Sequence, residues 1–288
     1  MSEQFTRLTQ GYGQSLSNIG NTFGSNRYIS GSKEFLNSNT LVAKIAFLVL
    51  VMIAFVLILR VGTSLITYFM APTSNPKLVD GMKPGHVAKM IPQDPKSSGS
   101  VTIMRSVDQN NGIEFSWSVW LFVEQLKQDG KFKHIFHKGN DGFSGGNSDG
   151  MSMPNNAPGL YLDKNTNNLV VIMNTYNNIT EKVNIKDIPL NKWINVIIRV
   201  EGDKMDTYIN GTIVNRHKFN SVPKQNYGDV YVNMNGGFDG LLSDLWYHDY
   251  GLSIREILAI AEKGPNMSMN KSMDVFPPYF SLRWYFRQ

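Results

Sequence analysis

The sequence predicts a mostly β protein, a two-sheet β-sandwich preceded by a single transmembrane α-helix. Two patterns carry this prediction. A long apolar run near residue 50 has the composition of a membrane span, and beyond residue 100 short alternating stretches follow one another between clusters of Asn, Asp, Gly and Pro. With 288 residues, 42% of them apolar, the chain is long enough to bury a substantial core.

The composition excludes several classes of function. The chain contains no cysteine, which rules out disulfides, a thiol nucleophile and cysteine-ligated metals. The net charge is +5; residues 1–40 contribute +1 and Lys44 with Arg60 contribute +2, which leaves +2 for the rest of the chain. No broad basic surface remains to neutralise a phosphate backbone, so we expect no binding of nucleic acid.

The apolar run from Ile45 to Leu59 contains no charged or strongly polar residue. Its length of ~22 Å as a helix is short of the ~30 Å apolar layer of a bilayer, so we expect a transmembrane helix over 41–70. Lys44 and Arg60 stand where long side chains can reach the headgroups, and Thr40 can cap the first turn. The expected anchoring residues are Lys44, Ile45, Phe47, Leu50, Ile53, Phe55, Leu59 and Arg60.

The position of the run argues against a cleaved signal peptide, which would begin within the first few residues of the chain. The remaining alternative is a buried helix in a soluble core. Basic residues are nearly balanced on the two sides of the run, so the face of the membrane that carries the C-terminal domain stays open.

Two segments flank the predicted helix. Residues 1–40 are polar, but apolar residues recur in them every three or four positions, which is typical either of an amphipathic segment on a bilayer or partner, or of a flexible tail. Residues 71–100 hold five of the twelve prolines. Because proline removes backbone donors and favours extended neighbours, we expect a semi-rigid linker there, with the soluble domain over 101–288.

Alternation with period two predicts the strands of that domain. In Glu114–Glu124 the residues Phe115, Trp117, Val119, Leu121 and Val123 share one face. The pair Asn210–Gly211 predicts a tight hairpin turn. Further strands are expected at 133–139, 159–163, 169–176, 193–202, 205–210, 212–217, 229–235 and 241–249.

A short helix and an aromatic tail end the chain. Ser253 and Glu256 have the spacing of a capping box, and Gly264 follows the helix that they would start. The tail 276–288 is rich in aromatic residues and is expected to form either a last strand or an exposed docking segment.

The domain resembles a known family. The runs EFSWSVWLFVE and HIFHKG, the phrase PLNKW before a strand, the hairpin YINGTIV and the stretch GFDG…LSDLWYHDYGLSIREI follow the order of a laminin-G-like domain over Val101–Asn266. This resemblance implies the concanavalin A-like lectin/glucanase fold, a jelly-roll β-sandwich. The fold carries lectins, glycoside hydrolases and adhesion modules, so it does not decide the function.

The membrane helix, the domain and the ending PPYFSLRWYF together resemble membrane-anchored minor capsid proteins of large icosahedral double-stranded DNA viruses. This second resemblance implies a structural protein of the virion that tethers an internal membrane to the capsid shell, with the lipid bilayer and capsid or other membrane-associated proteins as partners. It also implies a location at the interface between the virion's internal membrane and its capsid.

The residues of a glucanase are missing from the sequence. Retaining glucanases of this fold carry an E-x-D-x-x-E pattern on one strand, and from residue 100 onward no such pattern occurs. Glu181, Glu201 and Glu256 each stand alone. His134 and His137 are three apart and are expected on opposite faces of a strand, which disfavours a zinc site. We therefore expect no catalytic residues, no cofactor and no enzymatic activity.

The alternative function is a membrane-anchored lectin or attachment protein. A glycan or partner surface would use aromatic side chains, for which Trp246, Tyr247, Tyr250, Trp284 and Tyr285 are the candidates, although aromatic residues at the first three positions are more often core. No metal site is expected. The weak calcium candidates are Asp141 and Asp149, in the polar stretch 139–159.

Overall fold

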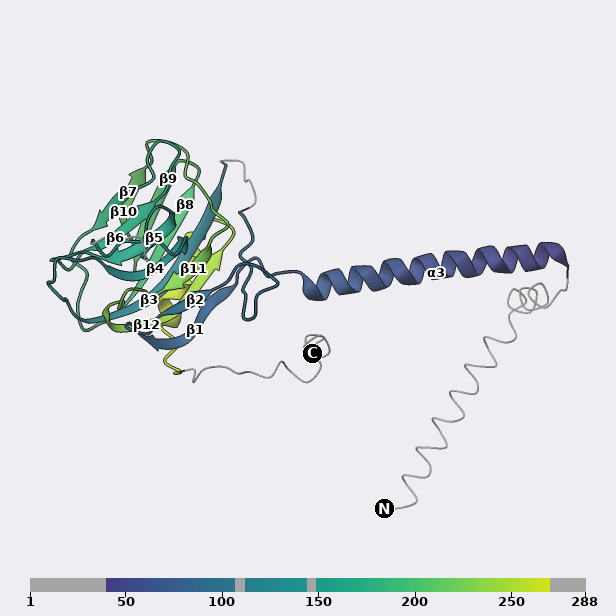
Figure 1. Cartoon of the computed structure of the whole chain (residues 1–288), viewed down its shortest axis with the longest axis horizontal. Helices are drawn as coiled ribbons and strands as arrows, with labels where there is room; N and C mark the ends of the chain where they lie inside the picture. The colour runs from purple at the N-terminus through teal and green to yellow at the C-terminus, as the bar shows by residue number, and fades with distance from the viewer. Residues whose placement is uncertain (1–39, 107–111, 144–148, 270–288) are drawn as a thin grey trace, which may run out of the picture. The chain divides into compact units, whose positions relative to one another are not determined.

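The computed structural model describes residues 40–106, 112–143 and 149–269 and divides the chain into two units between Ala71 and Pro72. The first unit contains helix α3 (Leu41–Met70) and the second a β-sandwich with helix α4 (Ile254–Lys263), shown in Figure 1. The N-terminal tail and the aromatic tail predicted from the sequence lie outside the described residues, apart from Thr40.

Helix α3 matches the predicted helix in both bounds. Thr40 caps it, since its side chain accepts a hydrogen bond from the backbone N–H of Ala43. Thirty residues give a length of ~45 Å, more than the ~30 Å apolar layer of a bilayer. All eight predicted anchoring residues lie on α3 with their side chains exposed. Within the described part of the chain, α3 is the one helix that is both long enough and apolar enough to cross a membrane.

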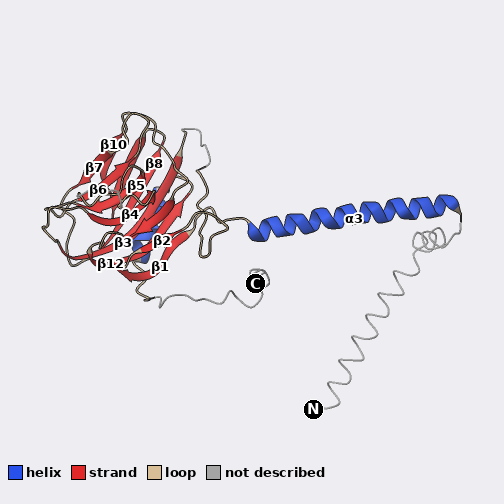
Figure 2. Ribbon diagram, viewed as in Figure 1, coloured by secondary structure: helices blue, strands red, loops and turns tan. Residues whose placement is uncertain are grey.

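The second unit is a sandwich of two six-stranded sheets in which every named pairing is antiparallel (Figure 2). Sheet A has the order β1 (Lys77–Pro84), β12 (Asp239–His248), β3 (Glu114–Gln125), β8 (Trp193–Glu201), β9 (Lys204–Ile209) and β10 (Thr212–Lys218). Sheet B has the order β2 (Lys89–Ile91), β11 (Asp229–Val232), β4 (Lys133–Gly139), β5 (Asn156–Leu162), β6 (Leu169–Met173) and β7 (Glu181–Ile185).

The core lies between the sheets, and alternation along the strands fills it. The five residues of β3 that the sequence analysis assigned to one face all belong to this core. On the opposite face of β3, Trp120 is buried as well, and Phe122 packs against Trp193. The prediction of a β-sandwich, with these five residues of β3 on one inward face, is therefore confirmed.

Local signals in the sequence are also confirmed. Asn210 and Gly211 join β9 to β10 with positive φ angles of 50° and 81°, as a type I′ turn requires. Ser253 caps α4 through the predicted capping box with Glu256. Helix α4 buries Ile257 against Ile197 and covers part of the outer face of sheet A.

The segment 71–100 differs from the predicted linker, because β1 and β2 lie within it. Both are terminal strands of their sheets, where a missing backbone donor costs little. Pro76 stands just before β1 and Pro84 is its last residue, so neither interrupts the middle of the strand. The register of β1 against β12 shifts twice, and Gly81 in β1 has a φ of 78°. Proline-rich composition therefore concealed two edge strands. The short strand β7 was not predicted either.

Candidate functional site

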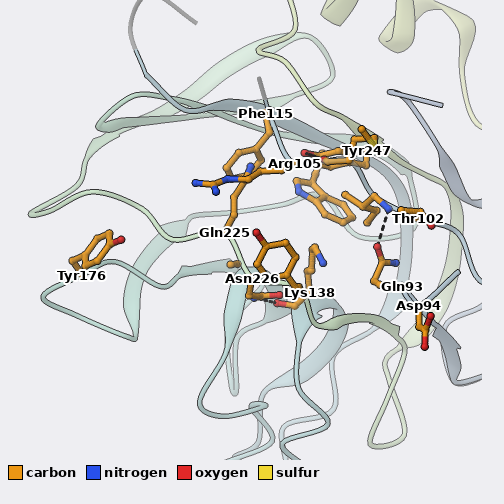
Figure 3. A pocket seen from close by; sticks show the side chains of 15 residues that line it. Gln93, Asp94, Thr102, Arg105, Phe115, Lys138, Tyr176, Gln225, Asn226 and Tyr247 are labelled. Carbon is orange, nitrogen blue, oxygen red and sulfur yellow. Dashed lines mark hydrogen bonds between the residues drawn. The ribbon is translucent and has the colours of Figure 1, made fainter. Parts of the chain in front are cut away.

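A cavity of about 420 Å³ opens between the two sheets at one end of the sandwich. Sheet A contributes Phe115, Trp117 and Tyr247, and sheet B contributes Lys138 and Ala157. The described segment 93–105, the loop 225–227 and Tyr176 complete the lining. In Figure 3, Arg105 and Phe115 lie on one side of the cavity, and Lys138 and Asn226 lie on the other. The volume is within the range of small-ligand sites.

Aromatic rings form the wall from sheet A. Tyr247 stacks on Phe115 with ring centroids 6.5 Å apart and meets Trp117 edge-on at 5.1 Å. The Tyr247 hydroxyl donates to the carbonyl of Met104 at 3.0 Å, and burial raises the pKa of this tyrosine. The wall is therefore rigid, and Tyr247 ties it to the segment 93–105.

The facing wall is polar and centres on Lys138. Its ammonium donates to the carbonyl of Gly228 at 2.6 Å, and burial lowers the pKa of Lys138 to about 8 although the charge of Asp229 favours protonation. Asn226 donates to the Lys138 carbonyl at 2.9 Å and accepts from the Gly228 N–H at 3.0 Å. The bond to Gly228 holds the buried ammonium at the cavity, and no carboxylate of the described residues contacts it directly.

Gln93 fixes the segment that closes a third side. Its side chain accepts from the Ile103 N–H and donates to the Val101 carbonyl, both at 2.9 Å. Its backbone N–H donates to Asp229 at 2.8 Å, which joins the segment to β11. Arg105 follows with an exposed side chain.

The structure separates the aromatic residues that the sequence analysis grouped as one surface. Tyr247 points into the core, whereas Trp246 and Tyr250 lie half-buried on the outer face of sheet A, where both rings contact His248. Trp246 donates to the Asn75 carbonyl at 2.7 Å, and Tyr250 donates to Glu256 at 2.9 Å. Trp284 and Tyr285 lie outside the described residues. Adjacent residues of a strand face opposite ways, so Trp246 and Tyr247 cannot share one platform.

The weak calcium candidates Asp141 and Asp149 are not assembled into a metal site. Asp149 pairs with Lys164 at 2.6 Å, which lowers the pKa of its carboxyl group, and Asp141 is exposed. The described residues contain no group of three or more His, Cys, Asp and Glu side chains that could hold a metal ion.

The expectation that His134 and His137 face opposite ways was wrong. A register shift in β4 beside Ile135 turns both Ile135 and Phe136 inward and leaves the two histidines on one face. His134 Nε2 and His137 Nδ1 are 2.7 Å apart. The bulge adds one residue to the strand, and this changes the side on which a residue three positions away appears.

The buried carboxylates of the sandwich are engaged in structural contacts. Glu181 contacts His217 and Thr175, and Asp206 forms a two-point ion pair with Arg216. Among the described lining residues of the cavity, Asp94 is the single carboxylate, and it accepts from the Lys96 N–H at 2.9 Å.

Sequence reasoning named Tyr247 as a candidate binding residue but missed the polar residues of the cavity. Lys138, Arg105 and Gln225 come from three separate segments, and only Lys138, in the run HIFHKG, lies in a stretch that the family resemblance used. A lysine at the end of a buried strand was the one available signal, since lysine is rarely buried unless it serves a specific contact.

Comparisons with known proteins agree with the sandwich. A family model described as the concanavalin A-like lectin/glucanases superfamily matches residues 95–258, more than half of the chain. No curated protein sequence matches the chain.

Similar solved structures include binding domains of botulinum neurotoxins. One is the serotype D ligand-binding domain in complex with N-acetylneuraminic acid, at 16% identity and a TM-score of 0.44, over 65% of this chain and 50% of that chain. Another is the serotype G binding domain, at 13% identity and a TM-score of 0.42, over 63% and 46%. The chain thus spans about half the length of these structures, and the likeness says nothing about ligands.

Proposed function

The chain belongs to the concanavalin A-like lectin/glucanases superfamily, and from this membership we propose that it is a membrane-tethered binding module without catalytic activity. In this proposal α3 holds the protein in a lipid bilayer and the sandwich binds a partner. The membrane and the partner are thereby kept at a short distance from each other.

The observation that carries the tether is the exposed surface of α3. Only 6% of its most apolar 18-residue stretch is buried inside the structure. Transfer of apolar surface out of water is worth about 25 cal/mol per Å², so a helix with this surface is strongly favoured in an apolar environment. A bilayer supplies that environment, and Lys44 and Arg60 can reach towards its two headgroup layers by extending their side chains.

The absence of catalysis is supported by the placement of carboxylates in the described part of the sandwich. Glycoside hydrolases of this fold class use two carboxyl groups that flank the scissile bond, roughly 5–9.5 Å apart. Asp94 is the single carboxylate among the described lining residues of the cavity, and its Oδ1 already accepts a backbone hydrogen bond. The cavity therefore suits recognition better than hydrolysis.

The finer assignment is a minor capsid protein that ties an internal viral membrane to the capsid shell. Its support is the resemblance in domain order, a membrane helix followed by a jelly-roll domain. The test is a variant that lacks residues 41–70, expressed during particle assembly. We expect this variant to be soluble and folded but missing from purified particles, and replacement of 41–70 by an unrelated apolar helix should restore incorporation. Normal incorporation of the deletion variant would reject the tether.

A membrane-anchored glycan-binding or attachment protein is the second candidate. The observation that favours it is the cavity itself, where aromatic rings face polar side chains, an arrangement common in sites for small polar ligands. A glycan array probed with the full-length protein in detergent, with and without a chelator, tests this function. Absence of binding to every sugar would exclude it, and binding that a chelator abolishes would also indicate calcium.

A further inference from the structure

The cavity contains hydrogen-bond donors that the described residues leave unsatisfied. Trp117 is only 1% exposed, yet its indole Nε1 has no hydrogen-bond partner. Lys138 has three N–H donors, and its one side-chain hydrogen bond goes to Gly228. Because buried polar groups are nearly always paired, an unpaired indole N–H in a cavity that a buried ammonium also lines indicates a ligand that accepts hydrogen bonds.

The mouth of the cavity is apolar and exposed. Tyr176 is 68% exposed, Tyr227 is 85% exposed, and Met104 at the same cavity is 42% exposed. Val222, also exposed, lies beside Tyr176, because its carbonyl accepts from the Tyr176 N–H. Aromatic, Met and Arg side chains are the types enriched in the centres of protein interfaces. The mouth is therefore suited to the side chains of another protein.

Charge favours an acidic ligand. Lys138 and Arg105 line the cavity, and the ammonium of Lys224 lies 4.7 Å from the ring centre of Tyr176. Against these three cations, Asp94 is the one carboxylate among the described lining residues. Asp229 is close enough to influence Lys138 and accepts the backbone N–H of Gln93, so the three cations outnumber the two nearby carboxylates by one.

Unpaired buried acceptors are few among the described residues of the same lining. Gln225 Oε1 is a buried acceptor without a partner, whereas the side-chain oxygens of Gln93 and Asn226 already accept backbone N–H groups. Sugar hydroxyls both donate and accept, so a neutral sugar buried there would find one unpaired buried side-chain acceptor, Gln225 Oε1, among the described lining residues. A carboxylate accepts only, which matches the surplus of donors.

We propose that this cavity is the docking site for an acidic segment of a partner protein. A carboxylate of that segment enters between Lys138 and Trp117, and the apolar residues beside it pack on Tyr176 and Tyr227. This inference rests on the proposed function as a membrane-tethered binding module and specifies the chemistry of its partner.

The test measures peptide binding to the full-length protein in detergent micelles by calorimetry. The probes are a blocked phenylalanyl-aspartyl-phenylalanine amide and its asparaginyl counterpart. We expect the aspartyl peptide to bind about tenfold tighter or more, because it adds a charged acceptor at a desolvated cation. Equal affinities for the two peptides, or no heat of binding at about 10 mM peptide, would overturn the proposal.

Variants locate the site. Lys138→Met should remove the preference for the aspartyl peptide, and so, in part, should Arg105→Gln, whose exposed side chain can change without affecting folding. The matched control is Lys192→Met. Lys192 is exposed and directly precedes β8, whose first residue, Trp193, pairs with Phe122, at the opposite end of β3 from the cavity residue Phe115. An unchanged preference in folded Lys138→Met and in Arg105→Gln would refute the assignment.

Glucuronic acid serves as the sugar probe. Binding of glucuronic acid at an affinity equal to that of the aspartyl peptide would replace the proposed partner by an acidic glycan. Peptide binding does not depend on α3, whereas the incorporation of the 41–70 deletion variant into particles does. The two experiments therefore distinguish failure of the docking site from failure of the tether.

Discussion

Glu181 and His217 join the terminal strands of the two sheets: Glu181 Oε1 on β7 lies 2.8 Å from His217 Nε2 on β10. Glu181 is 4% exposed and also accepts from the Thr175 hydroxyl and from the Asn220 backbone N–H. One buried carboxylate thus links the two sheets at the edge of the sandwich where β7 ends sheet B and β10 ends sheet A.

We expect Glu181→Ala to destabilise the sandwich by about 2–4 kcal/mol, because it removes the contacts of one buried carboxylate with His217, the Thr175 hydroxyl and the Asn220 N–H together. Chemical unfolding followed by tryptophan fluorescence measures this change, since the described tryptophans all lie in the sandwich. The matched control is Glu262→Ala, at an exposed position on α4. Similar losses in the two variants would show that Glu181 does not close the edge.

The two histidines of β4 predict sensitivity to acid. The backbone N–H of Met234 donates to His134 Nδ1, so His134 Nε2 must donate to His137 Nδ1, and His137 Nε2 then donates to the Asn140 carbonyl at 2.9 Å. Both rings are therefore neutral. Burial lowers the pKa of His134 well below its usual value and that of His137 to about 4.

Because these folded-state pKa values lie below the unfolded value near 6.5, the unfolded state binds more protons between the two, and stability falls as the pH drops through this range. We expect a loss of about 2 kcal/mol or more between pH 7 and pH 5, measured by chemical unfolding at both values. His137→Gln should flatten the pH dependence whatever its stability at pH 7. A pH dependence as steep as that of the unmodified protein would contradict this account.

The membrane helix predicts a position-dependent cost of charge. Ile53→Arg and Phe55→Arg together place two guanidinium groups near the middle of α3, at about 2.5–3.5 kcal/mol each for insertion. We expect the double variant to be released from membranes by alkaline carbonate, while the unmodified chain stays in the pellet. Leu41→Arg, at the first residue of α3, is the control and should remain membrane-bound.

The Tyr247 hydroxyl predicts a structural role for this ring. Tyr247→Phe removes the hydrogen bond to the Met104 carbonyl and should cost about 0.5–1.5 kcal/mol of unfolding free energy. Tyr227→Phe, at an exposed position of the same cavity, should change stability by less than about 0.5 kcal/mol. An unchanged free energy of unfolding in Tyr247→Phe would mean that the hydroxyl does not hold the segment 93–105.

Periodicity and local signals were sufficient for much of the architecture. Four predicted features each depend on residues close together in the sequence, and the structure agrees with all of them. They are the alternating residues of β3, the apolar length of α3, the Asn210–Gly211 turn and the Ser253 capping box. A pattern of this kind reports how one segment divides its side chains between water and an apolar environment.

The predictions that failed depended on contacts between distant segments. Strands β1 and β2 exist because β12 and β11 offer free edges, which no proline count can reveal. His134 and His137 meet because of a bulge that the pairing of β4 with β5 imposes.

By itself, the sequence determined an apolar helix before a mostly β domain, because the alternation of apolar and polar residues reports the burial of each segment, and its resemblance to laminin-G-like domains implied this superfamily. Only the tertiary structure decided that Lys138, Arg105 and Trp117 surround one cavity and that Tyr247 faces inward, away from Trp246. The physical reason is that a cavity is a property of how two sheets pack, and packing brings together residues whose separation in sequence carries no signal.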